Sequence, residues 1–525
     1  MMNWKELLNP DRVRSSESVR DKFDVRTPIE SDFGRAIFSS ASRRLHDKTQ
    51  VFPLTTDDNI HSRLTHSMEV MNIGMSFSLF LSQNETFLKK SGLDSEIVLR
   101  DVSSALRTAC LVHDIGNPPF GHFGEEAIQI YFKDLFEKLE NMIENQIAPT
   151  DDVLLAINRY LQDKAEIRAK KEDVEFGTLA KNEQVMFVKK ICEEEMQQVK
   201  LAALDYTQFD GNAEGLRVLS KLQYAGDLYG MNLTFATYGA YLKYPNAEQA
   251  VKGADMIARH KHGVFTTEQK LLMQVAEHCG MQNNRNIIVR HPLSFLMEAA
   301  DSICYLVMDI EDGINKKWIT VDQVCDALLS KRFVANEETR IARLYGNLED
   351  ILHSKEGYST KKMIKLRTSL MNYLIFVAEN NFVNKHNLIL NGEYQQELIE
   401  DDTYNVAKIL HEFCFKHILC HREIISLEIA GQAAINDMFN SYLKLLFSTN
   451  SKVRSRGKAL ISRSILYSII HEHFGGNYQK IDFEKFDVVE LTMEEKFRLV
   501  RDYVACMTDK FAINHNKKLR GQQVY

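Results

Sequence analysis

Residues 101–125 read DVSSALRTACLVHDIGNPPFGHFGE, and this stretch decides the fold. Apolar residues recur at helical spacing through its first half, which predicts a helix over residues 101–116. The Gly-Asn-Pro-Pro run that follows ends that helix, because proline has no amide hydrogen to donate. A second helix is expected from about Gly124. His113 and Asp114 therefore fall at the end of an apolar helix, directly before a stiff turn.

Helical periodicity covers most of the remaining chain. Residues 66–83 and 294–314 place apolar side chains at helical spacing, and the long second segment is apolar on one side. The chain has only 24 Gly and 8 Pro, which favours helix. Short strand candidates, such as NLTFATYGAYL (232–242), are too few to build a sheet. We therefore predict an all-α fold.

The helical pattern also indicates how the chain is organised. A loop-rich, basic stretch reaches about Ser62, and a helical core continues to about residue 320. A charged helical insertion is expected near residues 135–200, with a polar break at Ala148-Pro149-Thr150. Residues 321–525 form a further helical region. No linker rich in Pro or Gly marks the boundary near 320.

A helix is also expected over residues 209–223, where Asp210 or Asn212 is a candidate N-cap. Two basic stretches, 451–463 and 514–523, stand out from a net charge of −7. We interpret them as a solvated face and a frayed tail, because the chain as a whole has no general attraction to nucleic acid.

Composition limits the class of protein. The chain has 525 residues, with 44% hydrophobic and 26% charged residues, as a soluble globular protein does. Its eight cysteines form no C-x-x-C pair, which fits a reducing compartment. The N-terminal residues lack the apolar core of a signal peptide, and no apolar run is long enough to span a bilayer. We expect a cytoplasmic protein.

Four residues are candidate ligands of one metal ion. His113 and Asp114 can both turn inward at a helix end, His66 opens an apolar helix, and Asp301 lies inside the apolar stretch FLMEAADSICYLV. A buried carboxylate is costly without a compensating charge, which a metal ion would supply. Two imidazoles and two carboxylates leave positions open on a six-coordinate ion, as a catalytic site requires.

A histidine–carboxylate pair follows the metal candidates. His122 and Glu125 lie three residues apart at the start of a helix, so they can touch. Glu125 would then raise the basicity of His122, as in an acid–base dyad. The alternative is that Glu125 merely caps its helix and His122 is incidental.

Two further groups of side chains are candidate binding residues. Tyr305 and Asp309 follow Asp301 at i+4 and i+8, so one helix face presents a metal ligand, a flat ring and a carboxylate. The segment SRRLHDKTQ (42–50) brings Arg43, Arg44 and Lys48 near Gln50, and such cations suit phosphate. The alternatives are a core tyrosine with a surface aspartate, and a solvated basic loop.

The ordered set H…HD…D resembles that of the HD-domain phosphohydrolases. Longer strings resemble the bacterial dGTP triphosphohydrolases, over about residues 26–314 and in the order of that family. They are RTPIESDFGRAIFSSASRRLHDKTQVFPL (26–54), SRLTHSMEV (62–70), HDIGNPPFGHFGE (113–125), FDGNAEGLRVL (209–219), LKYP (242–245) and HPLSFLMEAADSICYLVMDIED (291–312).

The resemblance implies hydrolysis of a deoxynucleoside triphosphate, dGTP above all, to deoxynucleoside and inorganic triphosphate. It implies a divalent cofactor, Mn²⁺ or Mg²⁺, and a homo-oligomer such as a hexamer, with single-stranded DNA as a possible effector. The implied roles are metal ligation by His66, His113, Asp114 and Asp301; catalysis by His122 and Glu125; contact with the sugar by Gln50, Tyr305 and Asp309; and contact with the phosphates by Arg44, Arg63, Asn212, Lys243 and Tyr244.

One position departs from many relatives. Asn117 stands four residues after the metal histidine, where those relatives have a further histidine. Two other functions stay open at this point. One is an HD phosphohydrolase of broad dNTP specificity or acting on nucleoside monophosphates or cyclic nucleotides. The other is a regulator with a vestigial site that senses nucleotides or binds single-stranded DNA, for which the basic stretch 451–463 could serve.

Overall fold

The computed structural model describes residues 1–15, 24–55, 57, 59–172, 174–223, 227–251, 253–332, 339–354, 359–475 and 481–522. Within these ranges the chain is built of helices, and β-structure is limited to three isolated bridges. The predicted all-α fold is confirmed. None of the helices in the described part is long and apolar enough to cross a membrane.

The centre of the molecule is a bundle around one buried helix, α7 (Ser103–Val112). Most of its residues are shielded from solvent, because small and apolar side chains surround the whole helix. Its neighbours are α2 (Pro28–Ile37), α4 (Arg63–Gln83), α13 (Phe235–Tyr241) and α15 (Pro292–Asn315). Local signals set their starts, since Thr27 and Ser62 cap α2 and α4, and proline opens α2 and α15.

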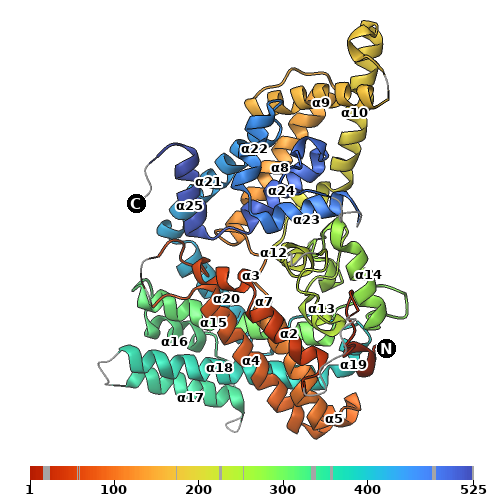
Figure 1. Ribbon diagram of the computed structural model, residues 1–525. Coiled ribbons are helices and arrows are strands. Elements are labelled where there is room, and N and C mark those ends of the chain that lie inside the picture. The colour runs from red at the N-terminus through yellow and green to blue at the C-terminus, as the bar shows by residue number, and fades with distance from the viewer. Residues whose placement is uncertain are drawn as a thin grey trace.

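A second bundle forms around α8 (His122–Ile143) and α21 (Arg422–Leu446), which pack together and against the C-terminal helices (Figure 1). Its other members are α9 (Asp152–Lys171), α10 (Lys181–Leu201), α22 (Ser451–Leu460), α23 (Arg463–His473), α24 (Met493–Ala505) and α25 (Asp509–Leu519). The α9–α10 pair forms the upper end of the view in Figure 1.

A third group, α16 (Val321–Leu329), α17 (Arg340–His353) and α18 (Ser359–Asn384), covers the outer side of α15 and lies at the lower left in Figure 1. The shorter helices are α1 (Trp4–Leu7), α3 (Ser40–Arg44), α5 (Glu85–Ser91), α6 (Ser95–Ile97), α11 (Ala203–Thr207), α12 (Gly211–Arg217), α14 (Gln269–His278), α19 (His386–Leu390) and α20 (Val406–Cys414). One continuous apolar core joins the described residues from Met2 to Ala512. The division near residue 320 stays a prediction.

Glycines bring the elements of the central bundle unusually close. A Cβ atom at Gly74 of α4 would lie 2.8 Å from the sulfur of Cys110 on α7. A Cβ atom at Gly116, in the turn after α7, would lie 1.9 Å from the backbone nitrogen of Gly215 on α12. Larger side chains at these positions would push apart the segments that carry His66, His113 and Asn212.

The structure corrects two expectations. The strand candidate at 232–242 is wrong, because Thr234 caps α13 there and every residue of that helix is buried. The frayed tail is also wrong, because α25 occupies residues 509–519 and donates to Asp437 on α21; residue 523 lies outside the described residues. In the basic stretch 451–463, Arg454 is not solvated but is buried in an ion pair with Asp487.

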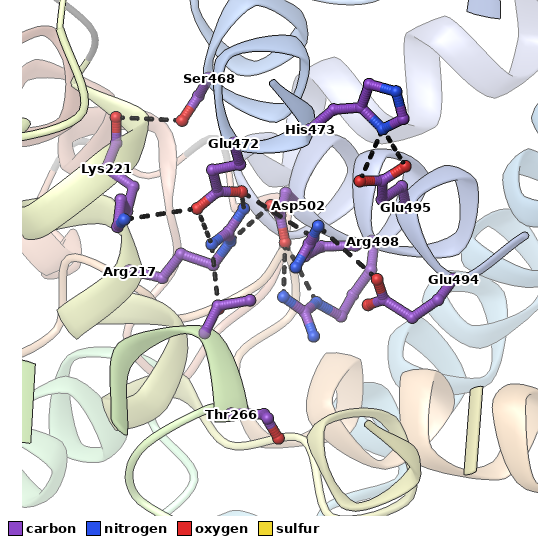
Figure 2. Close-up of polar contacts among 12 residues, drawn as sticks. Arg217, Lys221, Thr266, Ser468, Glu472, His473, Glu494, Glu495, Arg498 and Asp502 are labelled. Carbon is purple, nitrogen blue, oxygen red and sulfur yellow. Dashed lines mark hydrogen bonds and ion pairs between the residues drawn. The ribbon is translucent and has the colours of Figure 1, made fainter. Parts of the chain in front are cut away.

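A buried ionic network ties the C-terminal helices to the central bundle (Figure 2). The fully buried guanidinium of Arg217, at the end of α12, lies 2.6 Å from Asp502, 3.0 Å from Glu268 and 3.0 Å from Glu472. Asp502 belongs to α24, and its second oxygen accepts from Arg501 at 2.7 Å. Buried charges of this kind are tolerated only when they are paired, so the network holds α12 and α24 in one arrangement.

Candidate active site

A cavity of about 410 Å³ opens between the turn after α7, the face of α15 and the helices α20 and α21. The cavity brings together side chains from residue 49 to residue 428. Among the residues singled out in the sequence, those that line it are Gln50, Arg63, His113, Asp114, His122, Glu125, Asn212, Lys243, Tyr244, Asp301, Tyr305 and Asp309. His66 lies fully buried behind the wall, and Arg44 is not among the lining residues.

The four metal candidates converge at the floor of the cavity. Possible ligand atoms of His66, His113 and Asp114 all lie within 4.8 Å of one another. An oxygen of Asp301 lies 3.1 Å from Nε2 of His66 and 3.4 Å from Nε2 of His113. Asp301 thus contacts both imidazoles, although it is not one of the three residues that meet the mutual 4.8 Å distance.

The donor set fits a divalent cation. Nδ1 of His113 is 2.7 Å from the carbonyl of Cys110, while its buried Nε2 has no hydrogen-bond partner in the described part of the chain. Burial disfavours a charged imidazole, but Asp114 and Asp301 outweigh it and raise the pKa of His113 to about 9. The site therefore attracts positive charge, and a cation would take the place of that proton.

Asp114 is held by groups on both of its oxygens. Arg63 pairs with Oδ2, and Nδ2 of Asn117 donates to Oδ1 at 2.5 Å. Burial would raise the pKa of Asp114, but Arg63 and His113 lower it to about 2. Asn117, at the position where many relatives have histidine, thus orients a carboxylate.

The second pair, His122 and Glu125, is formed as expected. Nδ1 of His122 lies 2.9 Å from Oε2 of Glu125, and the imidazole is largely exposed to the cavity. The other oxygen of Glu125 accepts from the backbone nitrogen of Gly211 at 2.7 Å. Glu125 therefore does not cap its own helix: Gly121 is the N-cap residue there, with no side-chain bond.

The charges of this pair support each other. The carboxylate of Glu125 and its hydrogen bond raise the pKa of His122, although burial and the cations of Lys261 and Arg63 oppose this. Burial would raise the pKa of Glu125, but His122 lowers it to about 2. A charged imidazole beside a carboxylate is the arrangement of a proton donor.

One face of α15 lines the cavity, as the i, i+4, i+8 spacing predicts. Asp301, Tyr305 and Asp309 all reach it, and Gln50 enters from the loop before α4. Oε1 of Gln50 is buried and has no hydrogen-bond partner among the described residues. Burial and the charge of Asp312 raise the pKa of Asp309 well above its usual range, so this group is a potential hydrogen-bond donor.

Two lysines also line the cavity. Nζ of Lys243 lies 3.5 Å from Glu298 and 4.0 Å from Asp301, over the ring of Tyr244. Nζ of Lys261 lies 2.7 Å from Asp210, the N-cap residue of α12. Arg44 is instead close to the buried Lys48, whose pKa burial lowers to about 8.

Sequence reasoning missed several residues of this site. Lys261 stands in a loop with no motif, and Glu428, His411, Leu419 and Ile424 come from the region beyond residue 320. The only signal that could have found Lys261 is its charge in the segment RHKHG (259–263). Nothing in the periodicity of residues 406–446 singles out the other four.

Comparison with known proteins agrees with this site. The model of the HD domain family matches residues 63–197, which hold three of the four metal candidates. A "Deoxyguanosinetriphosphate triphosphohydrolase-like protein" of Listeria monocytogenes is 31% identical over 529 residues, covering 99% of this chain and 100% of the relative. A protein of that name from Synechocystis sp. is 29% identical, and a "Deoxyguanosinetriphosphate triphosphohydrolase" of Yersinia pestis is 27% identical; in both cases 99% of each chain is covered.

The similarity thus extends along the whole chain, beyond the segment that the HD model matches. It includes α15, which carries Asp301, and the helices α20 and α21, which close the cavity. This chain belongs to the deoxyguanosinetriphosphate triphosphohydrolase family of HD-domain proteins.

Proposed function

We propose that this protein is a metal-dependent triphosphohydrolase that converts dGTP to deoxyguanosine and inorganic triphosphate. One observation carries the proposal: a single cavity joins a His/Asp cluster, a His–Glu pair, a set of cations and a face of α15 that presents Tyr305 and Asp309. Family membership supports the same activity, because relatives along the full length bear that name.

His66, His113, Asp114 and Asp301 would hold the cation, Mn²⁺ or Mg²⁺. When bound, a divalent cation polarises a phosphoryl oxygen and neutralises part of its charge. The chain itself favours a cation here, because two carboxylates, Asp114 and Asp301, raise the pKa of His113 and Asn117 fixes one oxygen of Asp114. These roles follow from the donor set and from the resemblance.

The triphosphate would lie along the cationic residues that line the cavity. Lys243 and Lys261 supply point charges and Arg63 a planar guanidinium, while Asn212 and Tyr244 offer polar contacts within the same cavity. Lys261 joins the residues expected from the sequence. Arg44 stays a prediction, for it is not among the residues that line the cavity.

His122 would donate the proton that the leaving group needs. Water attacks the α-phosphorus, the bond to the 5′-oxygen breaks, and protonated His122 gives its proton to that oxygen. The attacking water releases one proton to solvent, and His122 takes one up from solvent before the next turnover. Glu125 keeps His122 charged for this step by raising its pKa. Gly211 in turn fixes Glu125 by a 2.7 Å hydrogen bond.

The sugar and the base would be read on the remaining walls. Gln50 and Asp309 suit the 3′-hydroxyl, since a buried oxygen of Gln50 has no hydrogen-bond partner in the described ranges. Tyr305 would pack on the deoxyribose, where a 2′-hydroxyl would clash. Glu428 is the acceptor available for the N1–H and N2–H₂ groups of guanine, and burial and Glu126 raise its pKa to about 7.

The proposal is tested by product analysis on the full chain. dGTP is incubated with Mn²⁺ or Mg²⁺, with a chelator as control, and the products are separated by ion-pair chromatography. Deoxyguanosine and intact triphosphate are expected, and Asp301→Asn should abolish their formation. The matched variant is Asp47→Asn, an exposed carboxylate outside the cavity, which should leave turnover unchanged. Release of orthophosphate, or full turnover by Asp301→Asn, would contradict the assignment.

A further inference from the structure

The junction between α24 and α25 contacts both loops that carry the proposed catalytic and sugar-reading residues. The side chain of Asp509, the first residue of α25, is buried. Its Oδ2 accepts from the backbone nitrogen of Thr49 at 3.0 Å, next to Gln50. Its Oδ1 accepts from the backbone nitrogen of Phe120 at 3.0 Å, two residues before His122. One carboxylate therefore bridges two loops that are 71 positions apart (120 − 49).

A second bond at the same junction acts on the same loops. The ammonium group of Lys48, in the Gln50 loop, donates to the carbonyl of Asn117 and, at 3.2 Å, to the carbonyl of Ala505 at the end of α24. Lys48 is almost fully buried. The ammonium nitrogen of Lys48 thus joins the two loops to the end of α24. The carboxylate of Asp509 joins the same two loops to the start of α25.

The bridged loop has a backbone conformation that needs such support. Phe120 has a φ of +66°, in the left-handed region that a residue with a side chain rarely adopts. Its ring lies against α21, where a Cβ atom at Gly431 would be 2.7 Å from the ring. Strained backbone persists only where the surroundings determine it strongly, and here Asp509 holds the amide while Gly431 leaves room for the ring.

α25 is itself anchored, so Asp509 is a fixed point. Tyr442 on α21 bonds to His515 on α25 at 2.5 Å, and Asn516 donates to Asp437 at 3.3 Å. The same helix α21 supplies Glu428 and Ile424 to the cavity. Asp509 therefore connects the two loops, through α25, to α21, the helix that forms the cavity wall proposed to read the base.

We propose that Asp509 is a positioning residue, which fixes the Gln50 loop relative to the His122 loop by accepting one amide from each. The inference rests on the proposed function for its effect on the reaction. It assigns a role to a residue near the far end of the chain, 197 positions (509 − 312) after Asp312, where the last sequence motif of the site ends.

The test uses Asp509→Asn in the full chain. An asparagine keeps the size of the side chain, but its NH₂ group cannot accept, so one of the two amides loses its partner. The matched control is Thr508→Ala, which removes the N-cap bond to Phe511 and weakens α25 without touching either loop. Circular dichroism would verify that both variants are folded.

Amide hydrogen exchange is the first readout, and it needs no catalysis. Pro118 and Pro119 carry no amide hydrogen, so a peptide over residues 118–121 reports only Phe120 and Gly121. In Asp509→Asn the amide of Phe120 or that of Thr49 should exchange at least about tenfold faster, because a bond to a charged acceptor is lost. Thr508→Ala should not change them. Unchanged protection at both amides in Asp509→Asn would overturn the proposal.

Kinetics with two substrates is the second readout. A 2′,3′-dideoxynucleoside triphosphate lacks the hydroxyl that Gln50 would read. The ratio of kcat/KM for dGTP over the dideoxy analogue should fall about tenfold in Asp509→Asn, as for one lost hydrogen bond. Equal losses on both substrates would mean a merely structural role and overturn the proposal. An inactive wild-type protein would refute the proposed function alone, because the exchange experiment would still decide whether Asp509 holds the loops.

Discussion

Gly211 is the position where the single added methyl group of an alanine should impair catalysis. An alanine Cβ there would lie 2.0 Å from Oδ1 of Asn117 and 2.8 Å from Oε1 of Glu125. Both distances are far below a van der Waals contact, so both side chains must move. Neither can move freely, because Asn117 is bonded to Asp114 and Glu125 accepts from Gly211 itself.

The size of the effect follows from these bonds. A hydrogen bond to a charged group contributes about 1.5–3 kcal/mol. Displacement of Glu125 from the backbone of Gly211 would remove one such bond from the group that keeps His122 charged. If the lost hydrogen bond stabilises the transition state by this amount, its removal decreases kcat about ten- to hundredfold, since 1.4 kcal/mol corresponds to about tenfold.

The assay is the release of triphosphate from dGTP by Gly211→Ala under saturating substrate, together with KM. The matched control is Gly346→Ala, a glycine within α17 whose added Cβ meets no atom within 4 Å. The control should keep wild-type kcat and a stability equal to or above that of the wild type. A Gly211→Ala protein with wild-type kcat would refute the reasoning that Glu125 acts through this contact.

Three further predictions concern charge. Glu125→Gln should move the descending alkaline limb of kcat/KM to lower pH, because the protonated acid is present only below the pKa of His122 and Glu125 raises that pKa; a pH–rate profile identical to that of the wild type would contradict this. Glu428→Ala should reduce the preference for dGTP over dATP by about tenfold or more, as measured by kcat/KM, because it removes a hydrogen-bond acceptor; an unchanged preference would place base recognition elsewhere. Arg217→Met should lower the free energy of unfolding in urea by about 3–5 kcal/mol, because it leaves buried carboxylates unpaired, and a loss below about 1 kcal/mol would show that the network is dispensable.

Local patterns in the sequence accounted for the part of the site that is built locally. The spacing of Asp301, Tyr305 and Asp309 placed them on one face because an α-helix repeats every 3.6 residues, and α15 obeys that period. The Gly-Asn-Pro-Pro run placed His113 and Asp114 at a helix end, because proline has no amide hydrogen to donate and so ends the helix. The convergence of His66 and Asp301 required tertiary packing. It was expected because one residue opens an apolar helix and the other is a carboxylate inside an apolar stretch, and the family resemblance implied it as well.

The remaining parts depend on contacts that no local pattern encodes. α13 has the aromatic and β-branched composition of a strand, yet burial on all sides and the Thr234 cap favour a helix. Glu428 and Asp509 meet the cavity and its loops only because α21 packs beside the cavity and the start of α25 packs against the loop that carries Phe120. The homo-oligomer and the single-stranded DNA effector stay predictions.

The central claim is the position of bond cleavage, and isotopic labelling tests it most directly. dGTP is hydrolysed by the full chain with Mn²⁺ in water enriched in ¹⁸O, and the products are weighed by mass spectrometry. Attack at the α-phosphorus predicts triphosphate that carries one ¹⁸O atom and deoxyguanosine that carries none. Label in the nucleoside, or phosphate and pyrophosphate in place of intact triphosphate, would contradict the account.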